Sequence, residues 1–315
     1  MKILVTPTTF TPKLKSLAIE KLRSFASDLT FNPHGRPLTE DELIPLLEGC
    51  EGCIAGVDYF GARVMENSKT LKIISRYGTG FDRVDLAAAK ANNIVVTNTP
   101  GVNSRAVADL AFGLLLCLAR KIHLLDRETR NGQWSRSTGI ELHGKTLGIL
   151  GLGFVGKEMA KRAAGFSMKI NAYDPLLDKN FAGVNGIISV DFDTLICSSD
   201  FLSLHLPLNN ETKNIISGEL MLKMKKGAVI INTARGGLVD ESAAYGLLAS
   251  GQLGGMGLDV FETEPPEKSP LFNLENVVLT PHTAAHTAEA AAAMADMSVQ
   301  NLIDVLSCNA CPYIL

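Results

Sequence analysis

Three glycines with a regular spacing follow an apolar run near the middle of the sequence. Thr146–Leu150 has the composition of a buried strand, and Gly151, Gly153 and Gly156 come directly after it. In this spacing the first glycine permits a tight turn, the second lets a pyrophosphate approach the backbone, and the third lets a helix pack closely on the strand. A helix that begins near Val155 would offer its unpaired N–H groups to the phosphates. The spacing therefore predicts a dinucleotide site.

An acidic residue at the end of the next apolar run would complete such a site. Met168–Tyr173 is predicted to be that strand, and Asp174 follows it, eighteen positions after Gly156. A carboxylate there accepts hydrogen bonds from the ribose hydroxyls and repels the 2′-phosphate of NADP, so NAD is the expected cofactor. The alternative is that Asp174–Pro175 only forms a turn.

Three further side chains combine charge with acid–base chemistry. Arg235, Glu264 and His282 each lie in a loop that follows an apolar run. Because parallel strands end at one edge of a sheet, and ligands bind there, we expect the three side chains to converge. Hydride transfer to or from a carbon that bears oxygen needs an acid or base for the proton and a cation that fixes the substrate. The preceding runs are Ala228–Asn232, Gly254–Leu258 and Val277–Thr280.

Short apolar runs alternate with helical segments along the whole chain. This alternation predicts parallel sheets covered by helices on both faces, and thus an α/β fold with two doubly wound domains. We expect one domain from residues 1–100 plus 284–315 and a second from residues 101–283. The other predicted strands are 3–5, 53–57, 71–75, 94–97 and 201–205, and the main predicted helices are 11–25, 39–47, 104–130, 154–164, 240–250 and 284–306.

The predicted helix 104–130 is apolar around most of its circumference in its first half. A helix of this kind is expected to be buried between domains or between subunits.

Composition and charge exclude several classes of partner. The chain has 315 residues, of which 46% are hydrophobic, and 30 basic residues stand against 33 acidic ones without any block of Lys and Arg. Nucleic acid and anionic membrane surfaces are therefore not expected as partners. The longest apolar stretch, Ala111–Ala119, is shorter than the ~20 residues of a membrane span, and residues 1–10 lack the apolar core of a signal peptide. We expect a cytoplasmic protein.

Six cysteines include two Cys-x-x-Cys pairs, Cys50 with Cys53 and Cys308 with Cys311. Four thiolates could hold one zinc ion. Cys53 opens an apolar run, however, and the second pair lies in the last eight residues, so we expect core and tail packing and no metal.

In the loops that contain Arg235, Glu264 and His282, the sequence resembles the D-isomer-specific 2-hydroxyacid dehydrogenase family, in its phosphoglycerate dehydrogenase-like form. The matching motifs run in order from about Leu71 to Leu306, and the first seventy residues match only in pattern. The resemblance implies a flavodoxin-like substrate domain, a Rossmann NAD-binding domain and a cleft between them. It also implies NAD-dependent exchange of a D-2-hydroxy acid with its 2-oxo acid. The further motifs are Tyr77–Asp82 with Val84–Leu86, Asn98–Gly101, Glu141–Ile149 and Leu204–Leu208.

The resemblance implies a role for each polar residue of the site. His282 would be the acid and base for the hydroxyl proton, and Glu264 would orient its ring and stabilise its protonated form. Arg235 would hold the substrate carboxylate with its planar fork. The backbone N–H groups of Gly78 and Thr79 would bind the same carboxylate from the first domain, and domain closure would expel water.

The resemblance also extends the cofactor site and implies an assembly. Asp259 would hold the nicotinamide amide. The family pattern and the apolar helix together predict a homodimer. Besides the glycines and Asp174, the residues implied to line the cofactor are Phe154, Val155, His205, Pro207 and Thr233.

Three residues depart from the family pattern. Asp109 stands where Glu is usual, and His286 brings a second imidazole near His282 that could lie at helical spacing and face the same cleft. Asp58 lies in the loop where phosphoglycerate-type members tend to carry a basic residue, so a phosphorylated substrate is not favoured. Glyoxylate, hydroxypyruvate and 3-phosphoglycerate all remain candidates. The alternatives are a non-enzymatic, NAD-sensing corepressor-like protein and a relative that oxidises another hydride donor such as phosphite.

Overall fold

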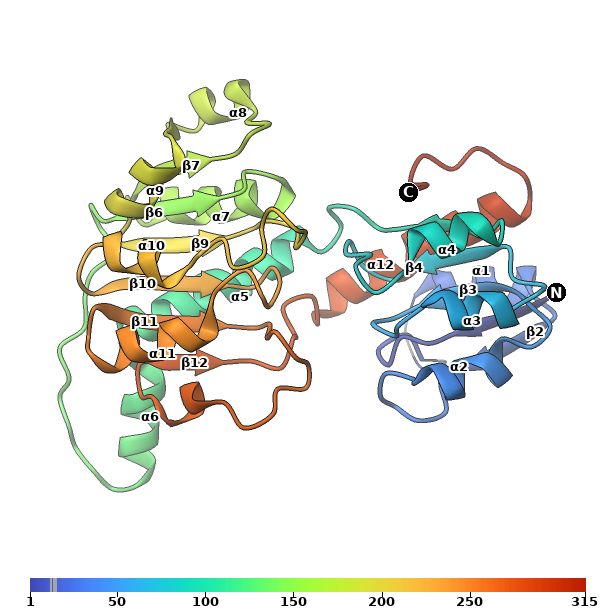
Figure 1. The fold of residues 1–315 in the computed structure, drawn as a ribbon, viewed down its shortest axis with the longest axis horizontal. Coiled ribbons are helices and arrows are strands. Elements are labelled where there is room, and N and C mark those ends of the chain that lie inside the picture. Colours follow the sequence, from blue (N-terminus) through green and yellow to red (C-terminus); the bar gives the residue numbers. More distant parts are fainter. Residues whose placement is uncertain (12, 14–15) are drawn as a thin grey trace. The chain divides into compact units, whose positions relative to one another are not determined.

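The computed structural model of the protein describes residues 1–11, 13 and 16–315. It divides into two compact units (Figure 1). Unit 1 consists of Met1–Asn103 and Ala285–Leu315, and unit 2 consists of Ser104–Ala284. The chain therefore leaves unit 1 once, builds all of unit 2, and returns to unit 1 with its last helix.

Unit 1 is built on a five-stranded parallel sheet with the strand order β2-β1-β3-β4-β5. This order is that of the flavodoxin-like doubly wound folds. The strands are β1 (Lys2–Val5), β2 (Asp28–Phe31), β3 (Cys50–Ala55), β4 (Ile73–Arg76) and β5 (Val95–Thr97), and the helices are α1 (Leu17–Phe25), α2 (Glu40–Leu47), α3 (Ala62–Asn67), α4 (Leu86–Ala91) and α12 (Ala288–Leu306).

Two buried clusters hold the helices of unit 1 on the two faces of its sheet. On one face, Ile3, Ile54 and Ile73 pack with apolar side chains of α1 and α12. On the other face, Leu4 and Ile74 pack with apolar side chains of α2, α3 and α4. Burial on both faces explains why the central strands read as continuous apolar runs in the sequence.

Unit 2 is built on a seven-stranded parallel sheet with the strand order β12-β11-β10-β9-β6-β7-β8. The order reverses between β6 and β9, where doubly wound sheets bind their ligands. The strands are β6 (Thr146–Leu150), β7 (Lys169–Tyr173), β8 (Ile188–Ser189), β9 (Phe201–Leu204), β10 (Ala228–Asn232), β11 (Leu253–Leu258) and β12 (Val277–Leu279).

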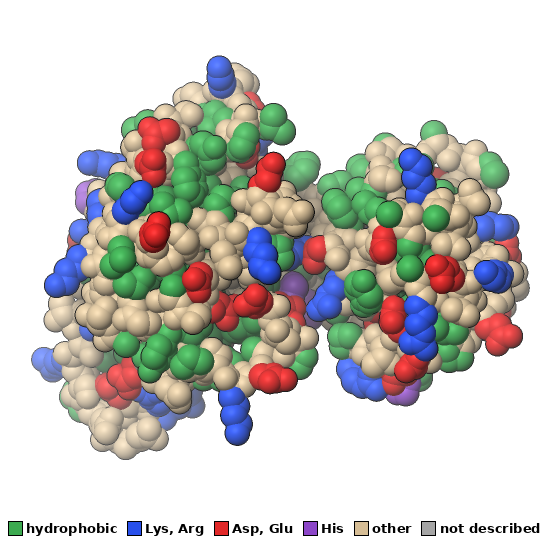
Figure 2. Space-filling view, viewed as in Figure 1, with side chains coloured by type: hydrophobic (Ala, Val, Ile, Leu, Met, Phe, Trp, Pro, Cys, Tyr) green, Lys and Arg blue, Asp and Glu red, His purple; other side chains and the backbone are tan. Residues whose placement is uncertain are grey.

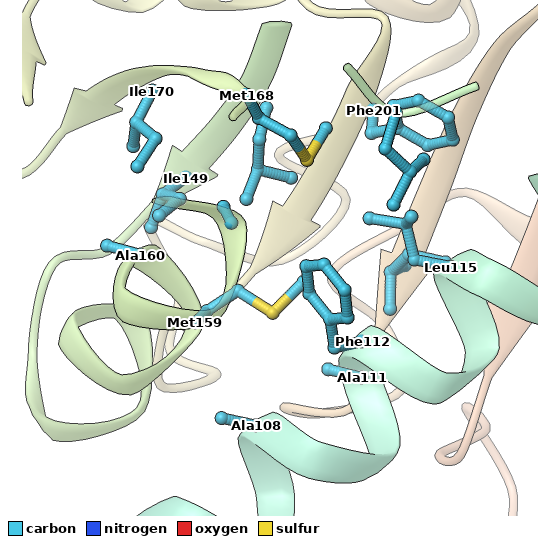
Figure 3. Close-up of a cluster of buried hydrophobic side chains, with 14 of the residues drawn as sticks. Ala108, Ala111, Phe112, Leu115, Ile149, Met159, Ala160, Met168, Ile170 and Phe201 are labelled. Carbon is cyan, nitrogen blue, oxygen red and sulfur yellow. The ribbon is translucent and has the colours of Figure 1, made fainter. Parts of the chain in front are cut away.

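Helices α5 and α7 pack together on the sheet of unit 2. Phe112 of α5 lies close to Met159 of α7 in the core that Figure 3 shows. Arg162 of α7 also pairs with Asp109 of α5, with Nε 2.7 Å from Oδ1. The helices are α5 (Ser104–Ala119), α6 (Ile122–Arg130), α7 (Phe154–Gly165), α8 (Lys179–Val184), α9 (Phe192–Ser198), α10 (Gly218–Lys223) and α11 (Glu241–Ala249), with a 3₁₀ turn at Pro270–Asn273.

The apolar helix predicted at 104–130 is not continuous. It is two helices, because Lys121 has a left-handed φ of 54° between α5 and α6. The N–H of Ile140 donates to the carbonyl of Ala119 at 2.9 Å and so satisfies the end of α5. Most apolar side chains of α5 are covered inside the core of unit 2, so their burial does not by itself require a partner domain or subunit.

Other differences concern short or terminal elements. The edge strands β2 and β8 and the helices α3, α4, α8, α9 and α10 were not predicted, because they are too short to show a period. Helix α12 begins at Ala288 rather than at 284, with the Thr287 hydroxyl accepting from the N–H of Ala290. The predicted helix 11–25 begins at Leu17, and residues 12, 14 and 15 lie outside the described residues.

Basic and acidic side chains are interspersed on the face that Figure 2 shows. Cys50 and Cys53 are buried in β3, whereas Cys308 is exposed. Within the described residues we find no group of three or more His, Cys, Asp or Glu that could hold a metal ion. None of the helices in the described ranges is long and apolar enough to cross a membrane.

Candidate active site

The glycine-rich turn after β6 has the backbone geometry that its spacing predicts. Gly151 has a left-handed φ of 95°, and a Cβ there would lie 2.5 Å from the carbonyl oxygen of His205. A Cβ at Gly156 would lie 2.1 Å from the carbonyl oxygen of Gly151. At Gly153 a Cβ would meet no heavy atom of the described residues within 4 Å. Two glycines thus allow close packing, and the third leaves space.

The first turn of α7 begins at this open glycine. Phe154 is exposed and Val155 is half-buried, so the turn lies at the surface of unit 2. The first N–H groups of a helix have no partner within the helix, and they carry the positive end of its dipole. A pyrophosphate fits this cradle, because the backbone is open at Gly153 and the helix is twelve residues long.

Asp174 directly follows β7, and its carboxylate lies beside the glycine-rich turn. Its Oδ2 accepts from the N–H of Leu152 at 2.7 Å, and its Oδ1 accepts from the N–H of Leu176 at 2.8 Å. These two bonds fix the carboxylate, and each oxygen keeps capacity for a further donor. The carboxylate is half-buried, so a ribose hydroxyl could reach it.

The ends of β9 and β10 contribute His205, Pro207 and Thr233. Burial lowers the pKa of His205 to about 3, and its Nε2 lies 2.9 Å from the Ser203 hydroxyl. His205 is therefore neutral and packed, whereas Pro207 is exposed. The hydroxyl of Thr233 is buried and has no hydrogen-bond partner among the described residues. Buried polar groups are normally paired, so this hydroxyl fits a site that a bound cofactor completes.

His282 and Glu264 form a hydrogen-bonded pair in unit 2. Nδ1 of His282 lies 2.7 Å from Oε2 of Glu264, and the other carboxylate oxygen accepts from the N–H of Phe261 at 3.1 Å. The His282 side chain is 40% exposed and that of Glu264 is 25% exposed. The imidazole is thus held at one nitrogen and remains open to solvent. Because Glu264 engages Nδ1, Nε2 is the nitrogen left for proton transfer.

Asp259 builds the loop that carries His282. Its buried carboxylate accepts from the Thr280 hydroxyl at 2.6 Å and from the N–H groups of Thr283 and Ala284 at 2.8 and 2.9 Å. The backbone N–H of His282 donates to the Asp259 carbonyl at 2.8 Å, and His282 itself has a left-handed φ of 49°. Such a φ is uncommon outside glycine, and these bonds hold it in place.

Arg235 follows β10 in a loop shaped by a buried asparagine. The side chain of Asn232 donates to the Arg235 carbonyl at 2.7 Å and accepts from the Ala234 N–H at 3.1 Å. A Cβ at Gly236 would lie 1.9 Å from the Phe261 carbonyl oxygen, so this loop lies directly against the loop that carries Glu264. Since β10, β11 and β12 are parallel neighbours, the three loops meet at one edge of the sheet.

Gly78 and Thr79 belong to unit 1, where they follow β4. Gly78 has a φ of 149°, and a Cβ there would meet no heavy atom of the described residues within 4 Å. The Gly78 carbonyl accepts from Thr99 N–H at 3.1 Å, and the Thr79 hydroxyl donates to the Thr99 carbonyl at 3.1 Å. We find no hydrogen bond from the N–H of either residue to another described residue. These groups could donate to an anion.

Two residues that depart from the family pattern differ from what we expected of them. Asp58 does not present its carboxylate to a ligand, because it is 1% exposed and accepts hydrogen bonds from Leu38 N–H and the Thr6 hydroxyl. The exposed acid that we expected to repel a phosphate at this loop is therefore not present at its surface. His286 is exposed in unit 1, and the backbone from 282 to 286 is not helical. Helical spacing between the two histidines is thus excluded.

Sequence reasoning overlooked the polar residues that shape these loops. Asn232 and Asn98 are buried and use their side chains to fix backbone carbonyls. An asparagine that directly follows or ends a strand, next to a loop with chemistry, is the signal that could have identified them.

Comparisons with known proteins give three kinds of match. Residues 112–284, more than half of the chain, match the family model described as D-isomer specific 2-hydroxyacid dehydrogenase, NAD binding domain. A hydroxypyruvate reductase of Thermotoga maritima is 45% identical over 80% of this chain and 84% of its own. A D-3-phosphoglycerate dehydrogenase of Archaeoglobus fulgidus is 47% identical over 73% of this chain but only 44% of its own length. The crystal structure of the TT0316 protein from Thermus thermophilus has a TM-score of 0.88 at 37% identity, with both chains fully covered.

Proposed function

Because the chain belongs to the D-isomer specific 2-hydroxyacid dehydrogenase family, we propose that it interconverts a D-2-hydroxy acid and its 2-oxo acid with NAD. The family match confirms the predicted class, an oxidoreductase with a nicotinamide dinucleotide cofactor, and the structural match confirms the predicted α/β fold. At the level of residues, the proposal depends on one observation. This is the 2.7 Å hydrogen bond between His282 and Glu264, in a loop cluster that also contains Arg235.

The residues of unit 2 that fit the cofactor are the glycine-rich turn, Asp174 and Thr233. The N–H groups at the start of α7 would bind the pyrophosphate, and Asp174 would accept from the ribose hydroxyls. The same carboxylate would repel a 2′-phosphate, which supports NAD over NADP. When bound, NAD supplies the ring that accepts or donates the hydride, which is chemistry that side chains do not provide.

His282 would handle the proton of the reaction. During oxidation of the hydroxy acid, Nε2 takes the hydroxyl proton, and during reduction it returns a proton to the carbonyl oxygen. Glu264 holds Nδ1, so it fixes both the tautomer and the direction of the ring. The left-handed backbone at His282 and the bonds from Asp259 would set where the ring lies.

Arg235 and the backbone of Gly78 and Thr79 would bind the carboxylate of the substrate. A guanidinium presents parallel N–H donors that match a carboxylate in a way that an ammonium cannot. Two backbone N–H groups add directed donors without a flexible side chain. This proposal makes 2-oxo acids with a free carboxylate the substrates to test first, among them glyoxylate, hydroxypyruvate, pyruvate and phosphorylated hydroxypyruvate.

The decisive experiment measures NADH consumption with this set of 2-oxo acids for the native protein and for His282→Ala. We expect the native protein to oxidise NADH with at least one acid and the variant to lose at least about 1000-fold in kcat. NADH binding, measured by fluorescence, should survive in the variant. A His286→Ala variant is the matched control and should keep near-native turnover. Native protein that binds NADH but turns over no acid would contradict the proposal, and so would an active His282→Ala.

We also propose a homodimer. Helix α6 has no buried residue within unit 2. Ile122 on this helix is 52% exposed, and Trp134, which follows the helix in sequence, is 81% exposed. A second subunit bound along this stretch would cover these two side chains and bury their apolar surface. Light scattering should give twice the 33.8 kDa of one chain, and a monomer at micromolar concentration would contradict this.

A further inference from the structure

Asn98 forms hydrogen bonds with three separate segments of unit 1. It is 7% exposed and comes directly after β5. Its backbone N–H donates to the carbonyl of Tyr313 at 3.3 Å, and its own carbonyl accepts from the side chain of Asn301 at 2.9 Å. Its side-chain amide donates to the carbonyl of Thr79 at 2.8 Å. One residue thus links the last segment, helix α12 and the loop after β4.

The segment Tyr313–Leu315 contacts β5 through an isolated antiparallel bridge and one further backbone hydrogen bond. Ile314 forms a bridge with Thr97, and the N–H of Leu315 donates to the carbonyl of Val96 at 2.9 Å. An unpaired strand edge otherwise leaves its N–H and C=O groups without protein partners. The end of β5 is therefore fixed by neighbours that are more than 200 positions away in the sequence.

The loop that contains Gly78 depends on its neighbours for its shape. Glycine has no Cβ and adopts more backbone conformations than any other residue, so Gly78 does little to fix its own φ of 149°. Three hydrogen bonds hold this loop from residues 98 and 99. Two join Gly78 and Thr79 to the backbone of Thr99, at 3.1 Å each, and the third comes from the Asn98 side chain.

We propose that Asn98 is a positioning residue for substrate. The backbone of Asn98 is fixed by hydrogen bonds to the segment Tyr313–Leu315 and to α12. Its side chain therefore holds the carbonyl of Thr79 in one position. The Gly78 carbonyl, held by Thr99, shares its peptide plane with the N–H of Thr79. The Thr79 carbonyl shares its plane with the N–H of Gly80, so the bond from Asn98 fixes the backbone directly after the two N–H groups and limits how far they can turn. Only the consequence for substrate binding rests on the proposed function. A purely structural role would instead lower the stability of unit 1 without a selective effect on this loop.

The first test measures the loop without substrate or cofactor. Hydrogen exchange of a peptide covering residues 76–81 is compared in the native protein, in Asn98→Ala and in the control Asn92→Ala. Asn92 is in the same unit, before β5, and its side chain also donates to one backbone carbonyl, that of Ala88, at 2.9 Å. We expect exchange at 76–81 to rise about tenfold in Asn98→Ala and to remain native in Asn92→Ala.

A second variant keeps the proposal testable if Asn98→Ala fails to fold. Removal of residues 313–315 takes away the partners of the Asn98 N–H and of the Val96 carbonyl, and leaves the Asn98 side chain in place. We expect faster exchange at 76–81 in this variant too. Exchange at 76–81 in the double variant should be no faster than in the more affected single variant, because both changes act through Asn98. Additive effects would contradict the route through Asn98.

The third test connects the loop to catalysis. In Asn98→Ala, the KM for the 2-oxo acid should rise about tenfold, since the N–H groups that meet the charged carboxylate are misdirected. kcat should change less than about threefold, and the affinity for NADH should stay native. Asn92→Ala should match the native protein in all three.

The outcomes separate this inference from the proposed function. Unchanged exchange at 76–81 in Asn98→Ala overturns the positioning role, whether or not the enzyme is active. Faster exchange together with an equal loss of kcat, or with a native KM, overturns its role in substrate binding. If exchange is faster in Asn98→Ala but the native chain turns over no 2-oxo acid, the role of Asn98 in holding the loop is supported and only the proposed function is contradicted.

Discussion

The two units offer different kinds of chemical group. In unit 2, the loops after β10, β11 and β12 offer the side chains of Arg235, Glu264 and His282, and buried polar side chains hold these loops. In unit 1, the loop after β4 offers backbone N–H groups at Gly78 and Thr79. A side chain is lost by one substitution, whereas a backbone group is lost only when the loop moves. A single substitution should therefore remove a chemical group of unit 2 directly. In unit 1, a substitution should act only by shifting the loop that presents the N–H groups.

The strongest test of this contrast is Arg235→Lys. The charge remains, but the planar fork is lost, so the carboxylate loses a pair of parallel hydrogen bonds. We expect kcat/KM for the 2-oxo acid to fall about 100-fold, which corresponds to about 3 kcal/mol. Steady-state kinetics at saturating NADH measures it. Native kinetics in this variant would remove Arg235 from the site.

Glu264→Gln tests the side-chain pair within unit 2. Glutamine can still accept from Nδ1 of His282, but it can also turn its NH₂ group toward the ring and favour the wrong tautomer. We expect kcat to fall about 30-fold, with little change in the KM for the oxo acid. A large rise in KM at native kcat would show that Glu264 binds substrate and does not act through the imidazole.

His205, in unit 2, should make the free energy of unfolding depend on pH. Burial lowers its pKa to about 3 in the folded chain, whereas the unfolded side chain titrates near 6.5. The unfolded state therefore binds the extra proton first, and the free energy of unfolding falls as the pH falls below about 6.5. Between pH 7 and pH 5 this residue should remove at most about 2 kcal/mol. Urea unfolding of native protein and of His205→Gln at both pH values measures it, and equal losses in the two would contradict the prediction.

Gly78→Ala tests the backbone region. A φ of 149° is a conformation that side chains rarely permit, so alanine there would shift the loop even though the space for a methyl group is open. We expect the KM for the oxo acid to rise about tenfold while NADH still binds natively. A native KM would show that the N–H groups of this loop do not contact substrate.

Thr79→Ala should have the smallest effect of the series. It removes a hydroxyl that donates to Thr99 and keeps the backbone N–H, so we expect less than about a threefold change in KM. A larger loss than that of Gly78→Ala would reverse the contrast, because it would assign the chemistry to the side chain.

The sequence was informative where burial on both faces produces continuous apolar runs. These runs predicted the central strands of both sheets, and the glycine spacing and the charged residues at strand ends predicted the loops of unit 2. Short edge elements such as β8 were missed, because two residues carry no period. The break at Lys121 was also missed, since the sequence does not show that the N–H of Ile140 bonds to the carbonyl of Ala119 at the end of α5.

Polar residues were the least predictable part. Asp58 and Asp174 are both acids that follow strands. Asp58 is buried and accepts hydrogen bonds from Leu38 and Thr6, whereas Asp174 is half-buried beside the glycine-rich turn. Only tertiary structure distinguishes them. Asn98 and the buried hydroxyl of Thr233 are similar cases, because their partners, or the lack of one among the described residues, depend on the packed chain.

The close approach of Gly236 to the Phe261 carbonyl has a practical consequence for directed evolution of substrate range. A methyl group cannot be placed there without separating the backbones that carry the guanidinium and the carboxylate. Libraries that randomise this position would mostly return inactive clones, and loop grafts from relatives should exchange both segments as one cassette. Substitutions should be better tolerated in the loop that follows β3 in unit 1, where Val57 and Tyr59 are about half exposed.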